Sequence, residues 1–195
     1  FHVYKEIANR DDIDLVLHLG DYIYEFGMGV FGDKDAQTLN RVVVPRYELN
    51  SLKDYRQRYA QHKGDPDSQA MLARHPLISI WDDHEISNDA WRLGAVNHSP
   101  DGSEGTFENR KRNAIKAYFE WMPIREPASE NSFIHRSFQI GDLVDLHMLD
   151  TRLIGRDQQL SYSNYTGLKT KQKPVHILNK TPKQFDSKQF HQDLL

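Results

Sequence analysis

Acidic side chains follow three short apolar segments of this sequence, and their positions suggest metal chemistry. The segments and the acidic residues after them are 13–19 with Asp21, 76–81 with Asp82-Asp83-His84-Glu85, and 143–149 with Asp150. Ligands of open α/β sheets bind outside the carboxyl ends of the strands, so three such ends can meet at one crevice. Carboxylates that meet repel each other, and a divalent or trivalent cation usually holds them together. We therefore expect a metal site where these segments end.

The residue types near Asp21 narrow the choice of metal. Carboxylates and the phenol of Tyr24 are hard oxygen donors, which suit Fe3+, Mn2+, Mg2+ or Ca2+. A phenol has a pKa of ~10, so only a strong Lewis acid displaces its proton, and Tyr24 favours Fe3+. Tyr22 is the alternative ligand. It lies one residue from Asp21, and in an extended segment its side chain would point to the opposite face.

Two metal ions would give this site hydrolytic chemistry. Ions about 3.5–4 Å apart activate a water and stabilise both oxygens of an in-line displacement. We expect Asp21 to bridge them. His84, next to Asp83, is placed to donate a proton to a leaving oxygen or to hydrogen-bond a phosphate. Asn88 and Asp89 are candidates for orienting the metal ligands, although capping explains them equally well.

Alternating strand and helix patterns are expected to position these residues. The runs 13–19, 76–81 and 143–149 predict short buried strands, the first of them parallel, and a Gly141-Asp142 turn predicts a hairpin that pairs the third run with 138–140. Apolar residues at helical spacing predict one helix after the N-cap Ser51 and another over 114–121, ended by Pro123. Residues 26–50 and 92–106 lack periodicity and are predicted to be loops. This alternation predicts a layered α/β or α+β architecture.

Length and composition set the outer limits. A chain of 195 residues predicts one domain. A net charge of -3 does not favour binding to nucleic acid, and the absence of cysteine removes disulfides, thiolate catalysis and cysteine zinc sites within this stretch. No apolar run reaches the ~20 residues of a membrane-spanning helix. The lysine-rich segment 169–188 is interpreted as a solvated surface insertion, with a partner-binding tail as the lesser alternative.

The motifs resemble those of the PhoD-type alkaline phosphatases, within the metallophosphoesterase superfamily. The resemblance runs from about Val3 to Leu160. Its two specific motifs are Asp14-Leu-Val-Leu-His-Leu-Gly-Asp-Tyr-Ile-Tyr-Glu25 and Trp81-Asp-Asp-His-Glu-Ile-Ser-Asn-Asp89, and the segments 117–125, 148–152 and 155–160 resemble later blocks. Asp83-His84-Glu85 stands where the wider superfamily has the Asn-His-Glu of a Gly-Asn-His-Glu motif.

The resemblance implies a role for each central residue. Asp21 would bridge two metals, Tyr24 would bind Fe3+ as in purple acid phosphatases, Asp83 would bind a second ion, Ca2+, and His84 would assist phosphate binding or proton transfer. Mn2+ or Mg2+ are possible substitutes. The family also implies a four-layer α/β/β/α core, small phosphomonoester and phosphodiester substrates, and export to the periplasm or out of the cell.

Asp150 and Arg152 are open to two interpretations. An aspartate after a strand is commonly a turn or capping residue, and Asp150 would then simply pair with Arg152. The functional interpretation places Asp150 among the site's outer partners and lets Arg152 contact a substrate phosphate.

Two family blocks fall outside the sequence. The upstream block contains a cysteine metal ligand and would precede Phe1, and the late Gly-Asp-x-His block would follow Leu195. We therefore expect residues 1–195 to be part of a single catalytic domain, in which 161–195 form a surface insertion or tail. The core of this part would be incomplete, and we expect no activity from it in isolation. The remainder of its own polypeptide is then its expected partner. The alternative is a non-catalytic metal- or partner-binding module that retains the fold.

Overall fold

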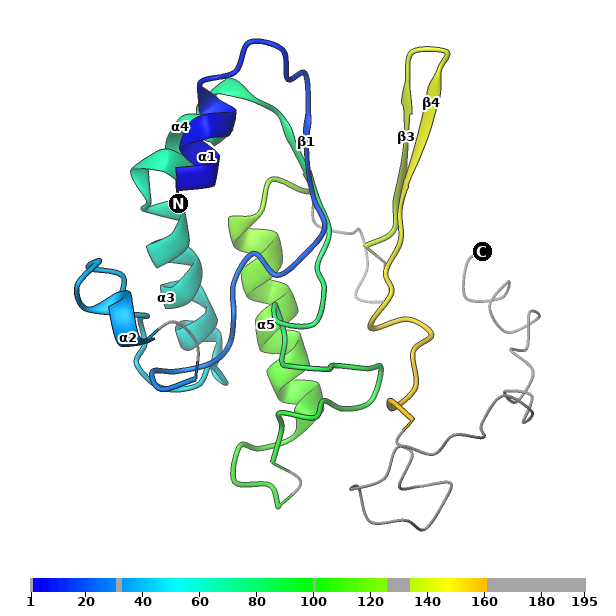
Figure 1. Ribbon diagram of the computed structural model, residues 1–195. Coiled ribbons are helices and arrows are strands. Elements are labelled where there is room, and N and C mark those ends of the chain that lie inside the picture. Colours follow the sequence, from blue (N-terminus) through cyan, green and yellow to red (C-terminus); the bar gives the residue numbers. More distant parts are fainter. Residues whose placement is uncertain (1, 31–32, 100, 126–133, 161–195) are drawn as a thin grey trace, which may run out of the picture.

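The computed structural model describes residues 2–30, 33–99, 101–125 and 134–160, and it is a mixed α/β structure with small sheets (Figure 1). Its helices are α1 (His2–Ala8), α2 (Asp33–Ala36), α3 (Leu52–Lys63), α4 (Pro66–Arg74) and α5 (Phe107–Trp121). Its strands are β1 (Val16–His18), β2 (Leu77–Ser79), β3 (Arg136–Ile140) and β4 (Val144–Met148). The lysine-rich segment 169–188 lies outside the described residues.

The first two strands pair in parallel, as the sequence predicts for the run 13–19. The register pairs Val16 with Leu77 and His18 with Ser79. Both strands are shorter than the apolar runs that predict them, because the residues that flank them turn away into loops. Only β2 is mainly buried, whereas Leu17 of β1 remains 45% exposed. Because the two strands are parallel, their carboxyl ends lie at the same edge of this small sheet.

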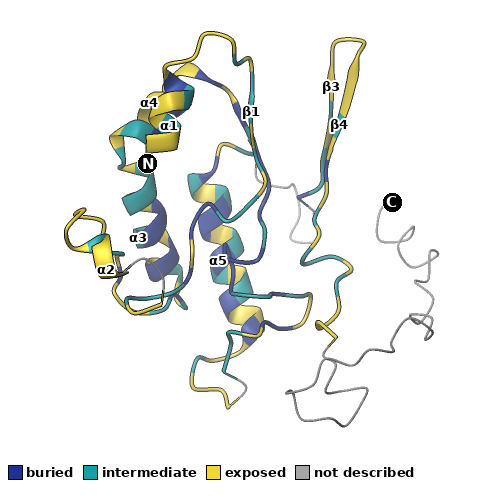
Figure 2. Ribbon diagram, viewed as in Figure 1, coloured by how far each residue is buried: buried dark blue, intermediate teal, exposed yellow. Residues whose placement is uncertain are grey.

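The expected hairpin is present, but the prediction that its second strand is buried is wrong. β3 and β4 pair antiparallel and form a sheet separate from β1–β2. Of the residues of β4, only Met148 is buried. Figures 1 and 2 show the hairpin projecting away from the helices, with most of its residues exposed. Val144 of β4 is therefore 45% exposed, whereas Met148 at the other end of the strand belongs to the core and Leu146 packs against it.

The two predicted helices are confirmed, with wider bounds for the second. Ser51 caps α3 in a reciprocal arrangement with Asp54, whose carboxylate accepts from the Ser51 backbone. Helix α5 begins at Phe107, after the N-cap Thr106, and therefore earlier than the predicted range 114–121. It ends before Pro123, as predicted. The structure adds α1 and α4, which the sequence analysis did not predict. It also places the single turn α2 within the segment 26–50, which was predicted to be entirely loop.

Figure 2 shows buried segments along α3 and α5, and aromatic side chains make up much of the core between these helices and the β1–β2 sheet. Tyr55 and Tyr59 of α3 and Tyr118 of α5 are fully buried. The Tyr118 ring meets Tyr59 and Trp81 edge-on, with ring centroids 6.4 and 5.3 Å away. Because Trp81 lies two residues after the end of β2, this packing fixes the start of the loop that carries the second acidic motif.

A glycine allows the two acidic loops to approach each other. Gly20 has a φ of +104°, and a Cβ built on it would lie 2.3 Å from the backbone nitrogen of Asp82. Only glycine adopts this conformation without a steric cost, and only glycine leaves room for the neighbouring backbone. The loop after β1 therefore lies directly against the loop after β2.

We expect Gly20→Ala to destabilise the protein by more than roughly 3 kcal/mol, because the new methyl group collides with backbone that packing holds in place. The matched control is Gly102→Ala. Gly102 also has a positive φ, +78°, but a Cβ there would meet nothing within 4 Å. Gly102→Ala should lower the free energy of unfolding only by the cost of the left-handed conformation, about 1–2 kcal/mol. Urea unfolding measures both losses, and equal losses would contradict the steric argument.

Candidate metal centre

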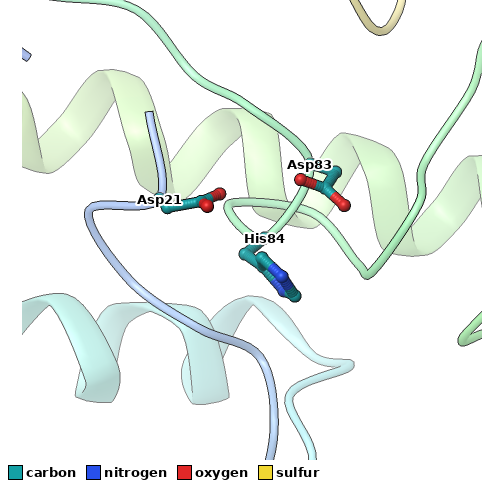
Figure 3. A group of neighbouring side chains, drawn as sticks. All are labelled: Asp21, Asp83 and His84. Carbon is teal, nitrogen blue, oxygen red and sulfur yellow. The ribbon is translucent and has the colours of Figure 1, made fainter. Parts of the chain in front are cut away.

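Asp21, Asp83 and His84 lie together at the edge where β1 and β2 end. One potential ligand atom from each side chain lies within 4.8 Å of the other two. Figure 3 shows the Asp21 carboxylate pointing toward Asp83, with the His84 ring beside them. Asp83 and His84 are buried, and Asp21 is half-buried. Residues 62 positions apart in the sequence (83 minus 21) are therefore neighbours, because parallel strands bring their carboxyl ends to the same side.

Tyr24 extends this cluster at its exposed side. Its hydroxyl donates a hydrogen bond to Oδ2 of Asp21 at 3.2 Å, and its ring stacks on His84 with a centroid distance of 4.1 Å. Partial burial, together with the charge of Asp21, raises the pKa of Tyr24 to about 12. The alternative ligand Tyr22 faces elsewhere, since its buried hydroxyl meets Ser68 Oγ at 3.2 Å. Of the two tyrosines, only Tyr24 offers its oxygen to the cluster.

The donor set fits a hard cation. Oδ1 of Asp21 is buried and has no hydrogen-bond partner among the described residues, which is costly for a carboxylate oxygen unless a positive charge faces it. Asp21 also has a φ of +55°, a conformation uncommon outside glycine and often found at functional sites. Two carboxylates, a phenol and an imidazole are ligands that Fe3+, Mn2+ and similar ions accept. A bound cation would also offset the charges that disfavour a Tyr24 phenolate.

Glu85 links the loop after β1 to the loop after β2, a role that the sequence analysis missed. Its fully buried carboxylate accepts hydrogen bonds from the backbone nitrogens of Asp21 at 3.1 Å, Asp82 at 2.8 Å and Tyr22. Burial raises the pKa of Glu85 to about 7, against the opposing effect of these N–H donors. The Asp-His-Glu motif places this glutamate in the acidic loop, but only the fold shows that it is buried and which backbone nitrogens it meets.

Glu25 is a second missed carboxylate, and it is fully buried behind His84. Its Oε2 lies 2.7 Å from Nδ1 of His84, and its Oε1 accepts from the backbone nitrogen of Asn88 at 2.6 Å. Burial alone would lower the pKa of His84, but the hydrogen bond and charge of Glu25, with Asp83 and Asp21, outweigh it and raise this pKa. The same hydrogen bond and the Asn88 N–H outweigh burial at Glu25 and lower the pKa of its carboxyl group.

Arg152 reaches the cluster from the far end of the described chain. Its Nε and Nη2 make a bidentate pair with Asp82 at 2.6 and 2.9 Å, and Nη2 lies 3.2 Å from Oδ1 of Asp83. Asp89 contributes through its backbone, whose nitrogen donates to Oδ2 of Asp83 at 2.5 Å. The contacts of Asp150 are those of a turn cap, because its Oδ1 accepts from the backbone nitrogens of Arg152 and Leu153 at 2.9 and 2.8 Å. Burial raises the pKa of Asp83, and the neighbouring Asp82 adds to this.

The fold and the site define the class of protein: a mixed α/β structure that carries acidic and histidine side chains where two parallel strands end. The model of the PhoD-like phosphatase family matches residues 1–191, and the chain belongs to that family. It is 35% identical over 165 residues to alkaline phosphatase D of Bacillus subtilis (strain 168), an alignment that covers 81% of this chain and 26% of the relative. The resemblance predicted from the sequence is confirmed.

A solved structure described as "Structure of PhoD" is also similar. It has 35% sequence identity and a TM-score of 0.67, and the match covers 80% of this chain and 29% of that one. The chain therefore spans between a quarter and a third of the length of these relatives. Within the described residues, every helix is too short or too polar to cross a membrane.

Proposed function

We propose that this chain supplies part of the active site of a metal-dependent phosphoric ester hydrolase that cleaves phosphomonoesters and phosphodiesters. The observation that carries the proposal is the meeting of Asp21, Asp83 and His84 within 4.8 Å, with the Tyr24 hydroxyl on Asp21. Family membership supports the same reaction class, since the Bacillus subtilis relative is an alkaline phosphatase. Small phosphate esters are then the substrates.

Each residue has a distinct role in this proposal. Asp21 would bridge two ions, Tyr24 would bind Fe3+, and Asp83 would bind Ca2+, for which Mn2+ or Mg2+ are possible substitutes. Such ions, when bound, supply the Lewis acidity that activates a water and neutralises phosphate charge. His84 transfers a proton to the leaving oxygen or hydrogen-bonds the phosphate. Arg152, held by Asp82, offers its guanidinium to a phosphate oxygen of the substrate.

The finer architecture and the location of the protein are proposals as well. We propose that β1–β2 belongs to one of the two central sheets of a four-layer α/β/β/α core, with α3 and α5 in the layer that covers it. The packing of Tyr59 against Tyr22 and of Tyr118 against Trp81, in the loops after β1 and β2, supports that placement. Residues 1–195 would then be part of one catalytic domain. Periplasmic or secreted location is proposed from the resemblance alone.

The proposal is tested on the longest native chain purified after growth with iron and calcium. Mass spectrometry of the metals should find iron together with calcium, and chromogenic phosphomonoesters and phosphodiesters should be hydrolysed. Absence of both bound metal and turnover would overturn the proposal. Stoichiometric metal without turnover would instead identify the non-catalytic metal-binding module that shares the fold.

A further inference from the structure

Both oxygens of the buried Glu25 carboxylate, which lies behind His84, have hydrogen-bond partners. Glu25 Oε2 faces Nδ1 of His84 at 2.7 Å, whereas Oε1 accepts from the Asn88 backbone nitrogen at 2.6 Å and from Nδ2 of Asn97 at 3.1 Å. An ionised carboxylate only accepts hydrogen bonds, so Nδ1 of His84 must present a hydrogen to it. Neutral histidine then carries its proton on Nδ1 and leaves the lone pair of Nε2 for the reaction side.

Asn97 fixes the orientation of that carboxylate. Its Nδ2 lies between two carboxylates, 3.1 Å from Glu25 Oε1 and 3.0 Å from Glu48 Oε1, and both can only accept. The Asn97 carbonyl accepts from Nη1 of the buried Arg110 at 2.7 Å, and Nη2 of Arg110 pairs with Glu48 at 2.7 Å. Asn97 lies in the segment 92–106, which shows no pattern in the sequence. This network nevertheless ties it to helix α5.

We propose that Glu25 and Asn97 are positioning residues that fix the ring orientation and the tautomer of His84. The inference rests on the proposed function for its catalytic consequence, but its geometric content stands on these hydrogen bonds. Glu25 sets which nitrogen of His84 carries hydrogen, and Asn97 holds Glu25 so that Oε2, rather than Oε1, meets the ring. Outer partners of this kind typically change activity by 10–100-fold when they are replaced.

Glu25→Gln gives the sharpest test, because the network dictates how the new amide turns. The donors of Asn88 and Asn97 require an oxygen at the position of Oε1, so the amide nitrogen takes the position of Oε2. That nitrogen donates toward Nδ1 of His84, and the ring must accept with Nδ1 and carry its hydrogen on Nε2. The substitution therefore reverses the tautomer, whereas the size of the side chain is unchanged.

The tautomer is measured by 15N NMR of histidine-labelled protein at an alkaline pH where the ring is neutral. His84→Asn assigns the signal. The native protein should show the Nδ1–H form and Glu25→Gln the Nε2–H form. Glu120→Gln is the matched control, since Glu120 pairs with Arg56 at 2.6 Å on the outer side of α5 and should leave the His84 signal unchanged. Native protein in the Nε2–H form, or no change in Glu25→Gln, would overturn the inference.

Kinetics supply the second readout. In Glu25→Gln, kcat should fall about 10²-fold with little change in KM and with native metal content, because an amide N–H that faces Nδ1 opposes the doubly protonated ring that donates a proton from Nε2 to the leaving oxygen. Asn97→Ala should lower kcat less, and the double variant should be no worse than Glu25→Gln alone, since Asn97 acts through Glu25. Additive losses, or native kcat in Glu25→Gln, would overturn the inference. An inactive native protein would refute only the proposed function, because the NMR result decides the positioning role independently.

Discussion

Asp21→Asn is expected to abolish stable metal binding and to lower kcat/KM by about 10³-fold or more. Asp21 has a buried oxygen without a hydrogen-bond partner among the described residues, and it lies against both Asp83 and Tyr24. An asparagine keeps the shape but removes the negative charge that we propose to bridge two ions, and it places an amide where the proposed site needs a carboxylate ligand. Lewis-acid stabilisation worth several kcal/mol corresponds to a rate factor of this size.

The matched control for this prediction is Asp14→Asn. Asp14 precedes β1, whereas Asp21 follows it, and its side chain is exposed. The same change of charge at the other end of the strand should leave metal content and kinetics unchanged. Metal content is measured by mass spectrometry and activity with a chromogenic phosphodiester. Native metal content in Asp21→Asn would show that Asp21 is not a ligand, whatever the effect on rate.

The sequence predicts this cluster because its signal is local. A short apolar run followed at once by a carboxylate predicts a strand and its end, and two adjacent parallel strands bring their ends together. Asp21 and Asp83 are predicted in this way, and the structure brings them together. The same logic fails to bring Asp150 to the cluster, because β4 pairs in a separate hairpin and not beside β2. Arg152, two residues later, reaches the cluster through its long side chain.

The supporting residues could not be predicted, because their roles depend on burial that only the folded chain reveals. Glu25 and Glu85 look like solvated acids in the sequence, yet both are fully buried and accept hydrogen bonds from loops brought together by folding. Arg58 is similar. It is fully buried and donates to the backbone carbonyls of Val44 at 3.0 Å and Phe26 at 3.1 Å, which holds the loop after Glu25. No periodicity marks such partners.

Tyr24→Phe is expected to remove a visible absorption band from the iron-loaded protein. A phenolate bound to Fe3+ produces a charge-transfer band, and the hydroxyl of Tyr24 lies at the cluster, 3.2 Å from Oδ2 of Asp21. In the absence of a cation the pKa of its phenol is about 12, because partial burial and the nearby carboxylates disfavour the phenolate. Ionisation near neutral pH therefore requires the metal, and the band reports the bond itself.

Tyr47→Phe distinguishes this effect from the loss of any tyrosine beside a carboxylate. The Tyr47 hydroxyl also donates to an aspartate, Asp54, at 3.1 Å, but Tyr47 belongs to the loop before α3 and is 60% exposed. The control should keep the full band. In Tyr24→Phe we also expect iron affinity to fall by roughly 10²-fold, at least as much as the loss of an outer partner causes. An unchanged spectrum in Tyr24→Phe would make Tyr24 a packing residue against His84 and would leave the ferric site without its phenolate.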